Sequence, residues 1–158
     1  DAELARLVAS VPADTAVYVT ADHGMVEIPF VDRVDLADEP ELNTGVRFVG
    51  GEPRAVQLYC APGAAADVAA AWRDRLGDRA TVTTRSDAVA AGLFGPPDVV
   101  AQRVLPRIGD VLVNCTGSLA VVDSMRMRRE LLVLLGLHGS VSEDEVAIPL
   151  FHWPARTA

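Results

Sequence analysis

Apolar residues at the N-terminal end of the chain follow first a helical and then a strand-like pattern. Within residues 2–11 they recur every three or four positions, which predicts an amphipathic helix that ends before Pro12. Residues 15–20 are apolar or β-branched on both faces, as in a strand covered on both sides of a sheet. The tripeptide Asp-His-Gly at positions 22–24 follows directly. Open α/β sheets commonly place functional residues at such strand ends, so this loop is the first candidate for chemistry.

The middle of the chain predicts a compact α+β unit preceded by an acidic linker. Residues 32–41 are rich in carboxylates and contain a proline, which indicates a solvated connection. Further on, Gly-rich turn chemistry at 50–53 joins two strand-like runs into a hairpin, and the helix that follows ends at Gly77. Ser86 is the expected N-cap of a second helix. The elements take the order β-β-α-β-α over residues 44–49, 54–60, 64–76, 79–84 and 86–92.

The last third of the chain predicts two further strands and a helical turn. The strands cover residues 110–115 and 119–123, and a short polar link joins them. Ser142 and Glu145 stand in the S-x-x-E order of a capping box, which predicts a final turn of helix. The two cysteines, at positions 60 and 115, lie in apolar runs without CxxC or Cys/His spacing, so we expect buried thiols.

The charge balance excludes several classes of function. The 158 residues carry 22 acidic side chains against 14 basic ones, all arginine, for a net charge of −8. Such a chain has no general attraction to a phosphate backbone or an anionic membrane, so we expect no nucleic-acid backbone binding. We also expect no membrane span, because no apolar run approaches the roughly 18 to 20 residues required.

Three side chains are candidates for metal ligation. Asp22 and His23 offer a carboxylate oxygen and an imidazole nitrogen on one loop, a pair suited to zinc or a similar divalent ion. His138 stands before Gly-Ser near the end of the chain. The alternative for all three is structural: Asp22 accepts backbone N–H groups in a turn, His23 caps the strand, and His138 is a hydrogen-bonded structural residue. His152, the third histidine, reads as structural or incidental.

Three segments resemble one known family. VYVTADHGMVEIP at 17–29 resembles the Asp-His-Gly segment of the type I phosphodiesterase and nucleotide pyrophosphatase branch of the alkaline phosphatase superfamily. GLHGSVSEDEVAIPL at 136–150 resembles the closing segment of that branch, which contains a late histidine. The stretch 45–82 is similar to the insertion found between those motifs in bacterial members. Order and spacing agree across most of the chain.

The resemblance implies a hydrolase with two divalent metal ions, zinc being the favoured metal. Asp22 and His23 would hold the metal on the nucleophile side, and His138 the metal on the water side. In the family a Thr or Ser nucleophile and further ligands precede the Asp-His-Gly motif. We therefore expect them upstream of Asp1, with no catalytic nucleophile in this chain. The chain then reads as a C-terminal portion, inactive in isolation and holding metal weakly or not at all.

The implied fold class is α/β, a portion of an alkaline-phosphatase-like sheet with an inserted α+β subdomain. Residues 1–35 would form core sheet with the Asp-His-Gly motif, 36–100 the β-β-α-β-α insertion, and 101–158 the return to the core sheet with the late histidine. Strands that lack part of their sheet would expose apolar surface, so self-association of the isolated chain is a further expectation.

Two classes of function remain open from the sequence. The first is a portion of an enzyme acting on a phosphodiester or nucleotide-like small molecule, although monoesterases, sulfatases, phosphonate hydrolases and mutases share the Asp-His-Gly segment. The second is a non-catalytic binding or interaction module built on the β-β-α-β-α unit. Geometry discriminates between them: convergence of Asp22, His23 and His138 within a few ångströms at the carboxyl ends of neighbouring strands favours the enzyme, whereas separate packed environments favour the module.

Overall fold

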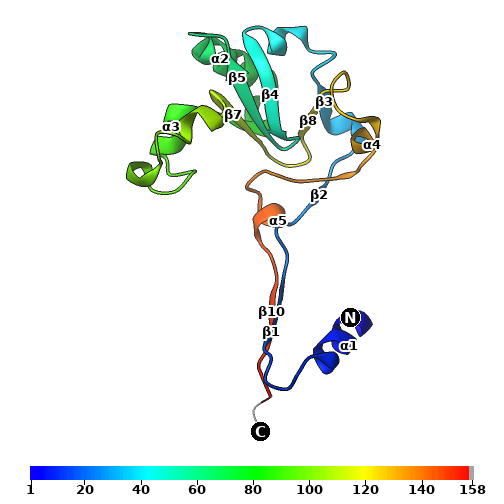
Figure 1. Cartoon of the computed structure of the whole chain (residues 1–158). Coiled ribbons are helices and arrows are strands. Elements are labelled where there is room, and N and C mark those ends of the chain that lie inside the picture. The colour runs from blue at the N-terminus through cyan, green and yellow to red at the C-terminus, as the bar shows by residue number, and fades with distance from the viewer. Residues whose placement is uncertain (157–158) are drawn as a thin grey trace.

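The chain folds into a rounded body and a long two-stranded ribbon that ends beside a short helix (Figure 1). The computed structural model describes residues 1–156. No helix within this range is both long enough and apolar enough to cross a membrane. The ribbon joins β1 (Val17–Thr20) to β10 (Leu150–Trp153), and α1 (Ala2–Ser10) lies at its far end. In sequence, the whole body therefore lies between β1 and β10, two strands that pair with each other.

A four-stranded antiparallel sheet forms the main layer of the body, in the order β4-β5-β7-β6. Its strands are β4 (Val46–Glu52), β5 (Ala55–Cys60), β6 (Ala80–Thr84) and β7 (Val111–Cys115). The expected hairpin is confirmed as β4–β5. Strand β7 lies between β5 and β6 in this sheet, although it follows residue 100, the expected end of the insertion. Cross-strand hydrogen bonds can satisfy a buried central strand only from two neighbours, and these two flank it.

Helix α2 (Ala65–Leu76) packs on one face of this sheet. Trp72 is fully buried in the main core, and its indole N–H donates to the Leu42 carbonyl at 2.9 Å. Gly77 ends the helix at φ +59°, a backbone angle that favours glycine, as expected from the sequence. On the opposite face α3 (Arg85–Ala90) packs a smaller cluster against β7. The α3 cap is Thr84 rather than Ser86: its hydroxyl accepts the Asp87 N–H at 3.2 Å.

The expectation that residues 32–41 form a solvated acidic linker is wrong. β3 (Arg33–Asp35) pairs in parallel with β8 (Ala120–Val122), and both Val34 and Leu36 are buried in the main core. The carboxylates of this segment are partly or fully exposed, whereas the apolar side chains of Val34 and Leu36 between them are buried. Composition averaged over the segment conceals that alternation, and the partner strand is remote in sequence.

The remaining elements are short. β2 (Val26–Glu27) pairs with β9 (Gly136–Leu137) in antiparallel fashion where the ribbon meets the body. The other short helices are η1 (Phe30–Asp32), η2 (Pro40–Asn43), η3 (Gly77–Arg79), η4 (Pro97–Val99), η5 (Leu105–Arg107), α4 (Arg129–Leu132) and α5 (Glu143–Val146). Of these, α5 is the helical turn expected after Ser142. The β2–β9 pair brings together the two segments that carry the candidate histidines.

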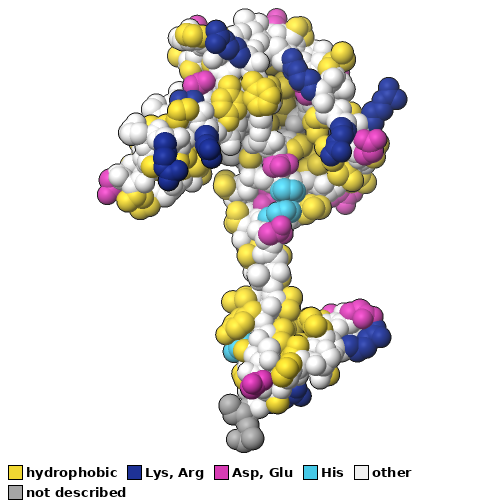
Figure 2. Space-filling view, in the orientation of Figure 1, with side chains coloured by type: hydrophobic (Ala, Val, Ile, Leu, Met, Phe, Trp, Pro, Cys, Tyr) yellow, Lys and Arg dark blue, Asp and Glu magenta, His cyan; other side chains and the backbone are white. Residues whose placement is uncertain are grey.

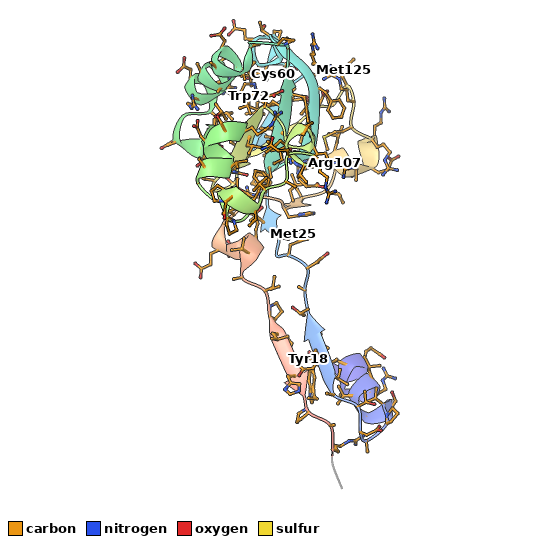
Figure 3. All side chains as sticks on the ribbon, turned by 60° about the vertical axis from the view of Figure 1, so that its left-hand side comes forward. Tyr18, Met25, Cys60, Trp72, Arg107 and Met125 are labelled. Atoms are coloured by element: carbon orange, nitrogen blue, oxygen red, sulfur yellow. The ribbon has the colours of Figure 1, made fainter. Side chains whose placement is uncertain are left out.

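The ribbon is apolar but uncovered, which differs from the expected strand buried on both faces. Tyr18 and Phe151 are exposed, and Figure 3 shows Tyr18 projecting from the isolated strand pair. The only cross-strand ring contact of Tyr18 within the described residues is with His152, at 4.3 Å between centroids. Two isolated strands seldom bury enough surface for independent stability. The apolar sequence of this ribbon is typical of a strand that is covered by other elements, yet here its side chains are exposed.

Candidate metal-binding site

Asp22 and His23 lie in the loop between β1 and β2, where the ribbon enters the body. The Asp22 carboxylate accepts the His23 backbone N–H at 3.1 Å and is otherwise open, with 90% of the side chain exposed. His23 Nδ1 lies 2.7 Å from the Gly24 carbonyl oxygen. Because a carbonyl only accepts hydrogen bonds, Nδ1 must carry the proton of this bond. In the neutral imidazole this leaves the lone pair on Nε2, the arrangement typical of a metal-binding histidine.

His138 follows β9 directly, and the β2–β9 pairing places it against His23. The two imidazole rings stack with 3.6 Å between centroids and an angle of 15° between planes. Figure 2 shows two histidines side by side at the neck between body and ribbon, next to acidic side chains. Three residues expected to converge are thus brought to one place, with Asp22 Oδ2 lying 3.8 Å from His23 Nε2.

Two glycines allow the histidine segments to approach the body closely. A Cβ on Gly24 would lie 1.8 Å from the Asp144 carbonyl oxygen, so only glycine fits after His23. The Gly24 N–H donates to the Glu145 carbonyl at 2.8 Å across this contact. Gly139, at φ +119°, follows His138, and a Cβ there would lie 2.7 Å from Glu52 Cβ. Because they have no Cβ, both glycines allow the histidine segments to pack closely against elements of the body.

A buried ion pair beside the histidines was not found from the sequence. Glu145, expected to close a capping box with Ser142, instead forms two hydrogen bonds to Arg54, at 2.8 and 2.9 Å. Burial alone would raise the pKa of Glu145, but hydrogen bonds from Arg54, Ser142 and the Ser140 N–H outweigh it and lower that pKa to about 2. No local pattern links Arg54 to Glu145, because the two residues are far apart in sequence.

The donor set fits part of a metal site. A separation of 3.8 Å between Asp22 Oδ2 and His23 Nε2 is compatible with one shared ion, because each ligand bond to zinc is about 2.0 to 2.2 Å long. Within residues 1–156, however, no group of three or more His, Cys, Asp or Glu side chains is arranged to hold a metal ion. The Asp22–His23 pair thus supplies two of the four ligands typical of zinc.

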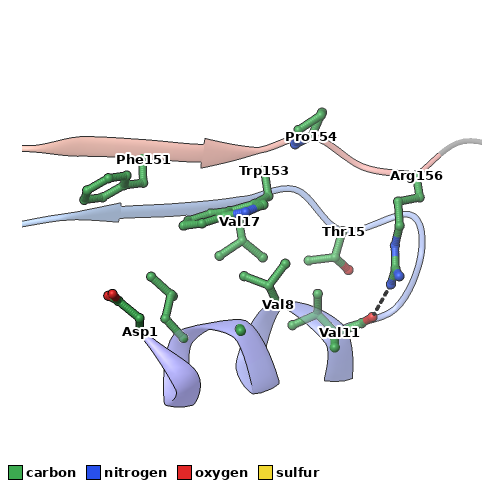
Figure 4. Close-up of a pocket in the computed structure, with 12 residues that line it drawn as sticks. Asp1, Val8, Val11, Thr15, Val17, Phe151, Trp153, Pro154 and Arg156 are labelled. Atoms are coloured by element: carbon green, nitrogen blue, oxygen red, sulfur yellow. Dashed lines mark hydrogen bonds between the residues drawn. The ribbon is translucent and has the colours of Figure 1, made fainter.

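A large groove lies elsewhere in the described chain. It measures about 700 Å³ between α1 and the ribbon, and its lining is mostly apolar, including Val8, Val17 and Trp153 (Figure 4). Arg156 at one end of the groove donates a side-chain hydrogen bond to the Val11 carbonyl at 3.3 Å. No histidine lines this groove, so it is separate from the candidate metal-binding site.

Comparison with known proteins identifies the family and the fold. The sequence model of the family described as type I phosphodiesterase / nucleotide pyrophosphatase matches residues 1–140. The fold is similar to human ectonucleotide pyrophosphatase / phosphodiesterase 5, with a TM-score of 0.56 and 15% identity over 87% of this chain and 33% of that one. For the murine protein the TM-score is 0.60 and the identity 12%, over 89% and 35% of the two chains.

A bacterial enzyme shares the same fold. Phosphonoacetate hydrolase from Sinorhizobium meliloti 1021, in complex with phosphonoformate, has a TM-score of 0.59 and 21% identity over 87% of this chain and 36% of that one. No curated protein matches the chain in sequence. The structural likeness confirms the expected α/β fold of alkaline-phosphatase type. The chain spans about a third of the length of these structures, at 33% to 36% of each.

Proposed function

The chain belongs to the type I phosphodiesterase / nucleotide pyrophosphatase family of the alkaline phosphatase superfamily, and we propose that it is one portion of a metal-dependent hydrolase of phosphate esters. In this proposal Asp22 and His23 bind one divalent ion and His138 a second, with zinc the favoured metal. The observation that carries the proposal is the convergence of the two histidines, 3.6 Å apart between ring centroids, from segments remote in sequence. A purely structural role for each histidine does not require that they meet.

Each of these residues has a defined task. The hydrogen bond from His23 Nδ1 to the Gly24 carbonyl orients the ring and directs Nε2 toward the Asp22 carboxylate. The exposed Asp22 carboxylate contributes negative charge to balance a cation. His138 presents a second imidazole beside the first. When bound, paired metal ions neutralise charge on a transferring phosphoryl group and lower the pKa of the attacking group.

The remaining ligands and the nucleophile belong, in this proposal, to protein outside these 158 residues. The chain spans only 33% to 36% of its structural neighbours, and its donor set supplies part of a site. We therefore expect the isolated chain not to hydrolyse phosphodiesters. We also expect it to bind zinc weakly, because a tightly held zinc needs four ligands.

The proposed substrates are phosphodiesters or nucleotide-like small molecules. Two observations on neighbours support this class: an inactive variant of the murine protein was solved in complex with AMP, and the bacterial hydrolase with phosphonoformate. Both ligands present a phosphoryl or phosphonyl group. The net charge of −8 argues against a nucleic-acid backbone as the substrate.

Paramagnetic NMR on the isolated chain tests the metal proposal with an internal control. Manganese(II) added to histidine-labelled protein should broaden the ring signals of His23 and His138 and leave those of His152 sharp. His152 is the matched control, because it stacks on Tyr18 in the ribbon. Equal broadening of all three histidines, or none, would refute selective metal binding by the isolated chain. Calorimetry should give a zinc dissociation constant in the micromolar range or weaker. A sub-micromolar constant would refute the conclusion that the site lacks ligands.

Activity measurements test the rest of the proposal. The purified chain, supplied with zinc or manganese, should show no steady turnover of a chromogenic phosphodiester, and turnover would refute dependence on residues outside it. In a chain that also contains the proposed nucleophile and remaining ligands, Asp22→Asn, His23→Ala and His138→Ala should each reduce kcat/KM by at least about 100-fold, an effect comparable to loss of a key electrostatic group. His152→Ala should leave it unchanged. Full activity in the first three variants would overturn the ligand assignment.

A further inference from the structure

Arg54 lies in the turn between β4 and β5 and is completely buried. Its Nε and Nη2 atoms donate to the two carboxylate oxygens of Glu145, at 2.8 and 2.9 Å. The Glu145 side chain is 1% exposed. This bidentate geometry fixes the orientation of both groups, whereas a single contact between two charges does not.

Arg54 is also anchored to the body independently of Glu145. Its Nη1 atom donates to the carbonyls of Gly117 and Leu119, at 2.9 and 2.7 Å. These carbonyls lie in the link between β7 and β8. The guanidinium is therefore held from the sheet side, and Glu145 is held by the guanidinium.

Glu145 in turn contacts both segments that carry the candidate histidines. Its Oε1 accepts the backbone N–H of Ser140 at 2.9 Å, two residues beyond His138, and its Oε2 accepts the Ser142 hydroxyl. Its backbone carbonyl accepts the N–H of Gly24 at 2.8 Å, the residue next to His23. One residue thus contacts a neighbour of each histidine.

We infer that Arg54 and Glu145 are positioning residues, which hold the His23 and His138 segments so that the two imidazoles face each other. The inference deepens the proposed function, on which its catalytic meaning rests. It also assigns a role to the β4–β5 hairpin: its turn supports the histidine site from the body side. Glu52, at the end of β4, adds to this support through its close approach to Gly139.

The energetics of burial favour this role over simple stabilisation. Removing two charges from water is costly, and a well-packed apolar pair of similar size often stabilises a protein equally well or better. An apolar pair, however, has no oxygen to accept the Ser140 N–H. What the ion pair supplies, and an apolar pair lacks, is a defined position for the segment that follows His138.

The double variant Arg54→Met/Glu145→Leu tests the inference without leaving a lone buried charge. Stacked imidazoles shift each other's ring-proton NMR signals, so these signals report the stack without any metal. In the variant, the displacement of the His23 and His138 signals from their unfolded-state values should fall by at least half. The His152 signals should not move. The control Glu39→Gln/Arg75→Gln, which removes a partly exposed arginine–carboxylate contact, should change none of the three.

The outcomes separate this inference from the proposed function. Unchanged His23 and His138 signals in a folded double variant would overturn the positioning role, whatever metal does. Loss of the stack, in a protein whose native form shows no selective manganese broadening, would support positioning and refute metal binding by the isolated chain. If the double variant does not fold, the variant Arg54→Lys is used in its place. Lysine keeps the positive charge but cannot form the bidentate hydrogen bonds to Glu145. The His138 signals of this variant should shift part of the way, and unshifted signals would overturn the inference.

Discussion

Acid should selectively remove the stabilisation that Glu145 provides. The pKa of its carboxyl is lowered from 4.5 to about 2 in the folded protein. A group whose folded pKa lies below its unfolded value stabilises the fold above the unfolded pKa. That stabilisation is lost as the pH falls from about 4.5 toward 2. The side chain is buried, at 1% exposure, so screening by solvent does not diminish the effect.

The expected magnitude follows from the size of the shift. Each pKa unit corresponds to about 1.4 kcal/mol, so a shift from 4.5 to about 2 corresponds to about 3 kcal/mol at neutral pH. At pH 3 the linkage relation leaves about 1 kcal/mol of this contribution. Lowering the pH from 6 to 3 should therefore remove about 2 kcal/mol that depends on Glu145 alone.

Urea unfolding of the native chain and of Glu145→Gln isolates this contribution. Other carboxylates, such as Asp35, also have lowered pKa values, but they titrate in both proteins and cancel in the difference. The native chain should be the more stable at pH 6, and its advantage over the variant should shrink by about 2 kcal/mol at pH 3. A difference that stays constant between these pH values would refute the assignment of a strongly lowered pKa to Glu145.

Three further features give testable consequences. Gly24→Ala should lower the free energy of unfolding by about 1 to 3 kcal/mol, because its Cβ would lie 1.8 Å from a carbonyl of α5 and displace the Gly24–Glu145 hydrogen bond; unchanged urea stability would contradict the close approach. Burial raises the pKa of Cys115 to about 12, so a thiolate-specific reagent at pH 8 should label it only on unfolding, and rapid labelling of the folded protein would contradict its burial. The uncovered ribbon should make the isolated chain self-associate in concentration-dependent light scattering, and Phe151→Glu should shift it toward monomer; a monodisperse native monomer would contradict this.

Local patterns in the sequence predicted the elements that depend on neighbouring residues. The spacing of apolar residues predicted α1, and Gly77 marked the end of the helix expected at 64–76, which is α2. The hairpin β4–β5 followed from its turn chemistry. These predictions hold because helix periodicity, helix ends and tight turns are set by interactions over a few residues.

Predictions that depended on remote partners were less accurate. The carboxylates around Val34 indicated a solvated linker, yet this segment pairs with β8 and buries its apolar residues. Glu145 matched the spacing of a capping box, yet its carboxylate binds Arg54 in the interior. In both cases the local composition was compatible with an exposed segment. Only the partner, distant along the chain, determined burial.

The candidate site shows the same division between local and remote information. The sequence by itself supplied the candidates for metal ligation, Asp22, His23 and His138, because donor atoms are properties of residue types. Only the tertiary structure decided that the two histidines stack, through the β2–β9 pairing and the Arg54–Glu145 contact. Chain closure over such long separations is determined by the packing of the whole body, which no local pattern encodes.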